Sequence, residues 1–216
     1  MLDSYGFDLW ANEYDKSVEI SDENNEYPFA GYKALMNSIY GVVMQRCPAK
    51  ILDIGFGTAL LSEQLYNKGN TITGIDFSDE MVKIAKEKMP KARLIRHDFS
   101  LGIPQSLLFE KFDFIVTTYA IHHLTDNAKI DFIMALLVML EKDGRIIIGD
   151  VSFQTRDDLD KCKNSCGDAW DNDEFYFVFE EIYDRLNAYC DMKYHKFSDC
   201  SGVLEICSKP DKLGFE

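Results

Sequence analysis

The alternation of short apolar runs with helix-forming stretches across residues 50–149 constrains the fold of this chain more than any other feature. The runs are five to seven residues long, and several are almost wholly apolar, which is typical of strands buried on both faces of a sheet. Such an alternation predicts parallel strands joined by right-handed crossovers. The expected strands are residues 50–55, 71–76, 92–97, 112–118 and 145–149, and the expected helices are residues 29–46, 58–68, 79–89, 126–140 and 173–189.

The C-terminal part changes character after this alternation. Residues 192–197 and 203–206 predict two strands around a Ser-Asp-Cys-Ser-Gly turn, and so short a connection joins antiparallel neighbours. The sequence therefore predicts an α/β three-layer sandwich with helices on both faces of a mostly parallel seven-stranded sheet that ends in an antiparallel C-terminal hairpin. We expect the 216 residues to form a single domain, with residues 1–47 as an N-terminal cap segment and residues 152–190 as a lid or substrate insertion.

Two glycines follow the first expected strand. Gly55 and Gly57 stand after Asp53, in the segment between that strand and the next helix. Glycine lets the backbone turn tightly and approach a ligand closely, and open α/β sheets bind ligands at this junction. The Asp-x-Gly-x-Gly segment therefore predicts a ligand-binding loop.

Three more signals of ligand binding lie at the ends of the next three expected strands. Asp76 lies 19 residues beyond Gly57, a spacing at which an acid accepts hydrogen bonds from ribose hydroxyls. Asp98 can accept from an exocyclic amino group while Phe99 flanks a purine, and Thr118 ends the fourth strand. Each acid taken singly is equally well explained as a helix cap or a turn residue. Signals at four successive strand ends together predict an adenosine-binding edge of the sheet.

Leu60 narrows the choice of adenosine ligand. The dinucleotide fingerprint G-x-G-x-x-G needs glycine at position 60, so a nicotinamide-dependent reductase is the less favoured alternative. The pattern instead resembles the class I, seven-stranded Rossmann-like S-adenosylmethionine (SAM)-dependent methyltransferases, across residues 10–206. More narrowly, Trp10-Ala11-x-x-Tyr14-Asp15 and Thr118–Leu124 are similar to segments of the small bacterial YrrT-like methyltransferases. The motifs that carry the wider resemblance are Leu52–Thr58, Gly74–Ser78, Arg96–Phe99, Phe112–Val116, Ile121–Leu124 and Leu140–Arg145.

The resemblance implies that the chain binds SAM and releases S-adenosylhomocysteine. It places Gly55 and Gly57 against the methionine moiety, with Asp53 near the amino group. One residue departs from the family pattern, because Ala59 stands where a third glycine is frequent; we expect alanine to be tolerated there as a helical position. The resemblance further implies cofactor contacts from Asp76 and Phe77 at the ribose, Asp98 and Phe99 at the adenine, Thr118 at the methionine end, and Tyr14 as a cover.

The sulfonium of SAM carries the reactive methyl group, so the protein has to hold an acceptor atom in line with it and exclude water. His122, His123 and Tyr119 are the candidates for a catalytic role, since histidine titrates near neutral pH. For the same three residues, capping of the loop, exposure to solvent and packing over the cofactor remain as alternatives to a catalytic role. No cluster of metal ligands is evident in the sequence, so no metal is expected. A non-catalytic SAM-binding module is the alternative to an enzyme.

The charge balance bears on the partners. Lys and Arg number 23 against 37 Asp and Glu, for a net charge of −14, which argues against nucleic acid or an anionic membrane as partner. Residues 1–27 hold eight acids against one lysine, and residues 153–189 hold ten acids against four bases. Because these segments are expected to cover the acceptor, we expect a small molecule that is neutral or cationic. The identity of the acceptor and the oligomeric state stay open.

The cysteines and the N-terminus bear on the compartment. Residues 1–10 carry two acids and lack a basic stretch before an apolar run, so no secretory signal is expected. The six cysteines form no C-x-x-C pair, which favours reduced thiols and a cytoplasmic protein. Cys162 and Cys166 are spaced to share a helix face, either as plain thiols or in a metal-binding or redox role.

Overall fold

The computed structural model describes residues 26–209 and contains one large mixed sheet. The seven main strands run in the order β3-β2-β1-β4-β5-β8-β7, and the two-residue strand β6 pairs with the end of β5. The pairs among β1 to β5 along this path are parallel, whereas β8 is antiparallel to both β5 and β7. The strands are β1 (Lys50–Ile54), β2 (Thr71–Asp76), β3 (Arg93–Arg96), β4 (Phe112–Thr118), β5 (Leu140–Phe153), β6 (Phe177–Val178), β7 (Cys190–Lys196) and β8 (Ser201–Ser208).

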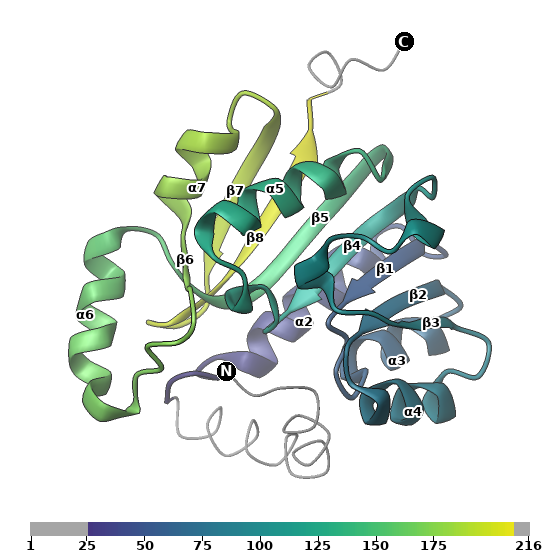
Figure 1. Ribbon diagram of the computed structural model, residues 1–216, viewed down its shortest axis with the longest axis horizontal. Coiled ribbons are helices and arrows are strands. Elements are labelled where there is room, and N and C mark those ends of the chain that lie inside the picture. The colour runs from purple at the N-terminus through teal and green to yellow at the C-terminus, as the bar shows by residue number, and fades with distance from the viewer. Residues whose placement is uncertain (1–25, 210–216) are drawn as a thin grey trace.

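Helices cover both faces of this sheet (Figure 1). One core contains buried side chains of α2, α3 and α4, and a second core contains those of α5 and α7. Neighbouring residues of one strand alternate between the two cores: Ile51 belongs to the first and Leu52 to the second. The helices are α2 (Tyr32–Met44), α3 (Leu60–Asn67), α4 (Asp79–Lys88), α5 (Asp126–Leu137), α6 (Arg156–Cys166) and α7 (Phe179–Leu186), with short 3-10 turns η1 (Phe99–Leu101), η2 (Gln105–Leu107), η3 (Ile121–His123) and η4 (Gly167–Ala169).

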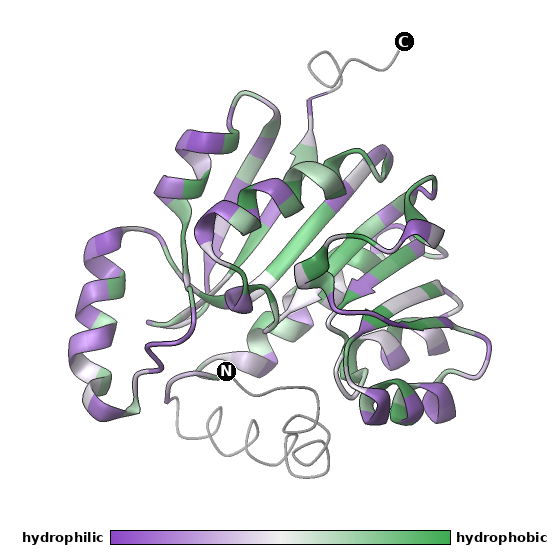
Figure 2. Ribbon diagram, in the orientation of Figure 1, coloured by the Kyte–Doolittle hydropathy of each residue, from purple (hydrophilic) through white to green (hydrophobic). Residues whose placement is uncertain are grey.

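Hydropathy follows these layers. The central strands β4 and β5 are mostly hydrophobic in Figure 2, whereas α6 is mostly hydrophilic. This contrast explains the largest error of the sequence prediction. Residues 153–173 hold no predicted element because they are polar, yet they contain α6, which buries Leu159 and Cys162 and begins with a capping box between Thr155 and Asp158.

The other differences are in the bounds of elements. The helix expected at 173–189 begins only at Phe179, because Phe177 and Val178 pair with β5 instead. The strand expected at 145–149 extends from Leu140 to Phe153 and includes a register shift against β4. The predicted order of strands and helices is otherwise confirmed, including the terminal antiparallel hairpin.

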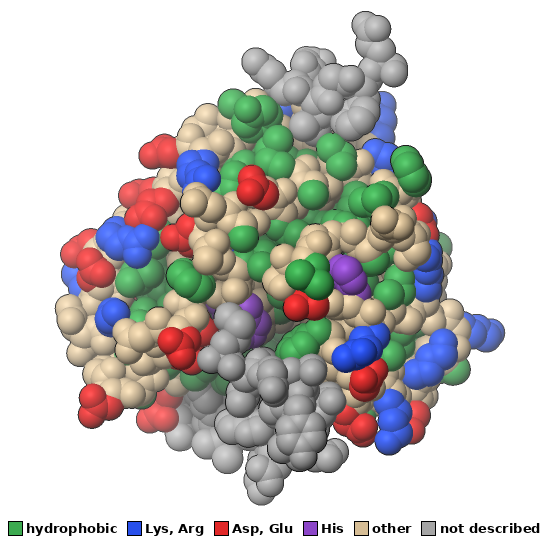
Figure 3. Space-filling model, in the orientation of Figure 1, with side chains coloured by type: hydrophobic (Ala, Val, Ile, Leu, Met, Phe, Trp, Pro, Cys, Tyr) green, Lys and Arg blue, Asp and Glu red, His purple; other side chains and the backbone are tan. Residues whose placement is uncertain are grey.

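On the face drawn in Figure 3, Lys and Arg side chains are interspersed with Asp and Glu. In the part of the chain that the structure describes, no helix combines the length and the apolar character needed to cross a bilayer. Tyr14 and most of the expected N-terminal cap segment lie outside the described residues.

Candidate active site

A cleft opens at the carboxyl ends of β1, β2 and β4, where the sequence predicts an adenosine-binding edge. Its empty space, part of which is open to solvent, measures about 750 Å³. The wall comes from α2, the loop after β1, the ends of β2 and β4, and the start of η1. The lining residues are Tyr32, Met36, Asp53, Gly55, Phe56, Gly57, Thr58, Leu60, Leu61, Asp76, Phe77, Met81, Phe99, Thr118, Tyr119, Ala120 and His123.

The loop after β1 is shaped by left-handed backbone conformations. Gly55 has φ +68° and Gly57 has φ +53°, a region that glycine adopts readily. A Cβ atom on Gly55 would lie 2.6 Å from the Cβ of Ala120, whereas one on Gly57 would meet no atom within 4 Å. Gly55 is therefore required by packing against the turn after β4, and Gly57 leaves open space in the wall of the cleft.

Ala59 differs from the sequence expectation. It is not a helical residue: it is the N-cap of α3, with φ +63° and ψ +30° in the left-handed region. A left-handed conformation costs a non-glycine residue about 1–2 kcal/mol. The family's glycine at this position therefore has a conformational reason, and this chain accepts strain there while burying the alanine methyl group.

We expect Gly57→Ala to weaken SAM binding by at least about 10-fold, because the new methyl group enters the open space of the cleft. Gly69→Ala is the matched control, since Gly69 also has positive φ and open space but lies outside the cleft lining. Both variants should lose about 1–2 kcal/mol of unfolding free energy from backbone strain. Calorimetry and thermal unfolding measure the two effects, and an equal loss of SAM affinity in both variants would contradict this role of Gly57.

Asp76 joins the end of β2 to the glycine loop. Its carboxylate accepts hydrogen bonds from the backbone N–H of Gly57 at 2.8 Å and of Ser78 at 3.0 Å. The side chain is buried and still lines the cleft. Carboxylate oxygens have further lone pairs, so Asp76 can accept hydrogen bonds from a ligand without releasing the loop.

Asp53 is the second carboxylate of the cleft. Its Oδ2 accepts a hydrogen bond from the Ser62 hydroxyl, and its buried Oδ1 has no hydrogen-bond partner within the described residues. Burial raises the pKa of Asp53, the Ser62 hydrogen bond lowers it in part, and the charge of Asp76 raises it, which together place this pKa at about 7. A ligand cation placed at Oδ1 would satisfy this atom and favour its ionised form.

The remaining predicted cofactor contacts are distributed unevenly. Phe77, Phe99 and Thr118 line the cleft. Asp98 is exposed and is not among the lining residues; its Oδ1 accepts from the N–H of Ser100 and caps η1. Its contact with the adenine stays a prediction.

The end of β4 turns sharply at Tyr119. This residue has φ +48°, which is rare for a bulky side chain, and its ring contacts the rings of Phe29 and Tyr32 at centroid distances of 5.1 and 5.2 Å. The turn leads directly into η3 and brings His123 to the cleft. Burial and, to a smaller extent, the neighbouring His122 lower the pKa of His123 to about 4.

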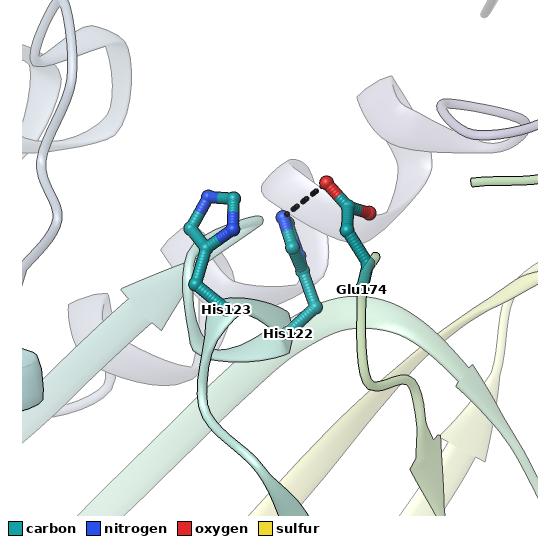
Figure 4. A group of neighbouring side chains, drawn as sticks. All are labelled: His122, His123 and Glu174. Atoms are coloured by element: carbon teal, nitrogen blue, oxygen red, sulfur yellow. Dashed lines mark ion pairs between the residues drawn. The ribbon is translucent and has the colours of Figure 1, made fainter. Parts of the chain in front are cut away.

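His122 lies next to His123 and faces the carboxylate of Glu174 (Figure 4). Its Nδ1 is 2.6 Å from Oδ1 of Asp150, and its Nε2 is 3.4 Å from Oε1 of Glu174. Burial lowers the pKa of His122, but the charges of Asp150 and Glu174 and the Asp150 hydrogen bond together raise it above its ordinary value. Sequence reasoning missed both acids. Asp150 directly follows the predicted strand 145–149, so the strand-end signal used for Asp76 could have found it, whereas Glu174 lies 52 residues beyond His122 in a segment without a local motif.

Comparison with known proteins identifies the family. A model of a methyltransferase domain matches residues 51–144. An uncharacterized methyltransferase of Alkaliphilus oremlandii is 31% identical over 190 residues, covering 86% of this chain and 84% of that protein. One from Bacillus mycoides is 38% identical over 157 residues, covering 72% of this chain and 70% of that protein. The chain is a class I SAM-dependent methyltransferase.

Solved structures agree with the fold of this methyltransferase. A SAM-dependent methyltransferase from Clostridium acetobutylicum matches with a TM-score of 0.69 at 18% identity, covering 90% of this chain and 98% of that chain. The complex of DhpI with S-adenosylhomocysteine matches with a TM-score of 0.65 at 16% identity, covering 96% of this chain and 95% of that chain. SAM is the cofactor, as expected, while the YrrT-like subtype stays a prediction.

The cleft itself fits this cofactor. The buried Oδ1 of Asp53 offers an acceptor for the cationic amino group of SAM, and Asp76 offers acceptors for hydroxyl groups. The anionic pyrophosphate of a nicotinamide dinucleotide would instead lie at the glycine loop, beside the Asp53 carboxylate, whereas Asp76 suits the ribose of either ligand. The charge of the cleft therefore favours SAM over the dinucleotide of a reductase.

Proposed function

We propose that this methyltransferase transfers the methyl group of SAM to a small-molecule acceptor by direct in-line displacement. The observation that carries the proposal is the shape of the cleft wall beyond the cofactor loop. There Tyr119 and His123 face a cleft that is also lined by Tyr32 and Met36 of α2. Aromatic and imidazole groups beside the cofactor residues suit a small organic acceptor held close to the methyl group.

SAM supplies an electrophilic methyl group on its sulfonium, so the residues of the chain have to bind, orient and exclude water. We assign Asp53 to the cationic amino group and Asp76 to the ribose hydroxyls. The whole set proposed to bind the cofactor is Tyr14, Asp53, Gly55, Gly57, Asp76, Phe77, Asp98, Phe99 and Thr118.

The three catalytic candidates have different surroundings, and we assign them different roles. Tyr119 packs among aromatic rings and shapes the wall. His123 lines the cleft and positions the acceptor. His122 is held by Asp150 on one side and faces Glu174 on the other, an arrangement that stabilises positive charge at its Nε2. We infer that His122 holds a positive charge beside the acceptor.

The segment from Ser152 to Cys190 supports a lid role for the expected insertion. Trp170 and Tyr176 pack against each other and against Tyr27 at the start of the described chain, so this segment meets the N-terminal one. The acids of both segments favour a neutral or cationic acceptor over an anionic one. The six free thiols suit a reducing compartment, and we place the enzyme in the cytoplasm.

Calorimetry with SAM and S-adenosylhomocysteine tests the cofactor site directly. We expect one site per chain with both ligands, and absence of binding at millimolar concentrations would overturn the proposal. A methylation screen with isotopically labelled SAM against a metabolite pool tests turnover, with products identified by mass spectrometry. Binding of SAM without any methylated product would instead favour the non-catalytic module.

A further inference from the structure

The side chains of His122, His123 and Glu174 converge at one point beside the cleft (Figure 4). One potential ligand atom of each lies within 4.8 Å of the others. His122 and His123 come from the short turn η3, and Glu174 comes from the segment that precedes β6. We propose that these three residues bind a divalent transition-metal ion, with an open coordination position for a heteroatom of the acceptor.

The distance between His122 and Glu174 suits ligands of one ion. Their Nε2 and Oε1 atoms are 3.4 Å apart, which is longer than the usual 2.7–3.2 Å of a hydrogen bond. Two ligands that lie about 2.0–2.1 Å from a tetrahedral zinc ion are about 3.3–3.4 Å from each other. The pair therefore has the separation that a shared metal ion requires, and rotation of the His123 side chain supplies the third ligand.

The ring of His122 is oriented by a carboxylate at the nitrogen that faces away from Glu174, as is common for metal-binding histidines. A histidine that ligates a metal usually donates its other ring N–H to a carboxylate, which fixes the ring and leaves the opposite nitrogen free for the ion. Asp150 has this position at Nδ1, at 2.6 Å. Asp150 is itself fixed, because it also accepts hydrogen bonds from the N–H groups of His122 and Val151.

Glu174 is held in place through its neighbours. The N–H of Phe175 donates to the carbonyl of His122 at 2.8 Å, and the fully buried Lys129 donates to the carbonyl of Phe175. The Tyr176 hydroxyl donates to Oε2 of Glu174 at 2.7 Å, which leaves Oε1 directed at His122. The segment that carries Glu174 is thus hydrogen-bonded to η3 through His122 and to α5 through Lys129.

The charge and the ligand types favour a transition metal. Asp150 and Glu174 carry two negative charges beside the imidazole of His122, against one positive charge on Lys129. Two imidazoles and one carboxylate suit Zn²⁺ or Fe²⁺ better than Mg²⁺ or Ca²⁺, and three protein ligands leave positions open. Because His123 also lines the cofactor cleft, an acceptor hydroxyl or thiol bound to the ion would lie near the methyl group and would release its proton to solvent more readily. This role in catalysis rests on the proposed function, whereas binding of the ion does not.

Titration of the metal-free full-length protein with Co²⁺ tests the site. We expect one Co²⁺ per chain, with visible d–d absorption and without the near-ultraviolet charge-transfer band of a cobalt thiolate. Glu174→Gln keeps an acceptor for Tyr176 but removes the charge, and it should weaken Co²⁺ binding by at least about 10-fold, as should His122→Gln. Asp150→Asn should also weaken it, by about 10- to 100-fold, as expected for a residue that orients a ligand.

Two controls separate this site from incidental binding. His195 and Glu205 form a similar pair at 3.5 Å on β7 and β8, so His195→Gln should leave Co²⁺ affinity unchanged. The sulfur atoms of Cys162 and Cys166 lie 3.9 Å apart, and their double replacement by serine should also have no effect. Failure to bind one equivalent, unchanged affinity in Glu174→Gln, loss of binding in either control, or a thiolate band would each overturn the inference.

Parallel calorimetry with SAM keeps the two proposals distinct. Glu174→Gln should retain the thermal stability and the SAM affinity of the parent protein, which shows that it is folded. A protein that binds SAM but not Co²⁺ would overturn the metal site and leave the proposed cofactor site intact. A protein that binds Co²⁺ but not SAM would overturn the proposed cofactor site and leave the metal site intact.

Discussion

Replacing Asp76 with alanine is expected to weaken SAM binding by at least about 100-fold. Two ribose hydroxyls would each lose a hydrogen bond to a charged acceptor, worth about 1.5–3 kcal/mol, and every 1.4 kcal/mol is about tenfold in affinity. The glycine loop would also lose its tie to β2, because the N–H of Gly57 donates to this carboxylate. Isothermal titration calorimetry with SAM measures the effect.

Asp79 provides the matched control for Asp76. It stands three residues further on in the first turn of α4, and its carboxylate pairs with Arg96 on the surface at 3.1 Å. Asp79→Ala should leave SAM affinity within about twofold, since exposed ion pairs contribute about 0–1 kcal/mol. Similar affinities for the parent protein and Asp76→Ala, in a sample that unfolds cooperatively, would contradict the ribose role.

Replacing Asp53 with asparagine is expected to stabilise the cofactor-free protein at high pH and to weaken SAM binding at the same time. The folded state raises the pKa of Asp53 from 3.8 to about 7, so the folded protein holds a proton that the unfolded chain has released. Stability of the parent protein therefore falls as the pH rises from about 4 to about 7, by an amount on the order of 4 kcal/mol. The side-chain amide of the Asp53→Asn variant cannot ionise, so the variant lacks this loss.

The same carboxylate should make SAM binding depend on pH. Only ionised Asp53 attracts the cationic amino group, so the affinity of the parent protein should fall as the pH drops below about 7, and Asp53→Asn should be weak at every pH. Ser62→Ala removes a hydrogen bond that lowers the pKa of Asp53, and should move the transition to higher pH. Denaturant unfolding and calorimetry from about pH 5 to about pH 8 measure these effects, since this range spans the shifted pKa; a pH-independent SAM affinity would rule out Asp53 as the partner of the amino group.

The parts of the fold that the sequence predicts well are those with a strong local pattern. Strand β4 is almost wholly apolar, and α4 has its cap at Ser78, so the predicted bounds of both lie within one residue of the observed ones. Helix α6 escapes prediction because it is polar on most of its surface, although the Thr155–Asp158 capping box marks its start. Residues 177–178 fall within a predicted helix because their pairing with β5 depends on a contact that is distant in the sequence.

The residues of the candidate site also differ in how strongly the local sequence marks them. Asp53, Gly57 and Asp76 could be found from the sequence because parallel strands that are neighbours in a sheet bring their carboxyl ends to one edge. Asp150 lies at the same edge, directly after the predicted strand 145–149, and was overlooked although the same signal marks it. Glu174 could not be found, since it reaches His122 from an irregular segment. Lys129 was also missed, because a lysine on a helix is ordinarily exposed, whereas this one is fully buried against the carbonyl of Phe175.

The hydrogen bonds between the glycine loop and β2 lower the entropic cost of binding the cofactor. The N–H of Gly55 donates to the carbonyl of Ile75 and the N–H of Gly57 to the carboxylate of Asp76, both at 2.8 Å and both made by the chain alone. The loop is thus pre-organised, and little conformational freedom remains to be lost when a ligand arrives. Association should be limited by the encounter itself rather than by a slow ordering of this loop.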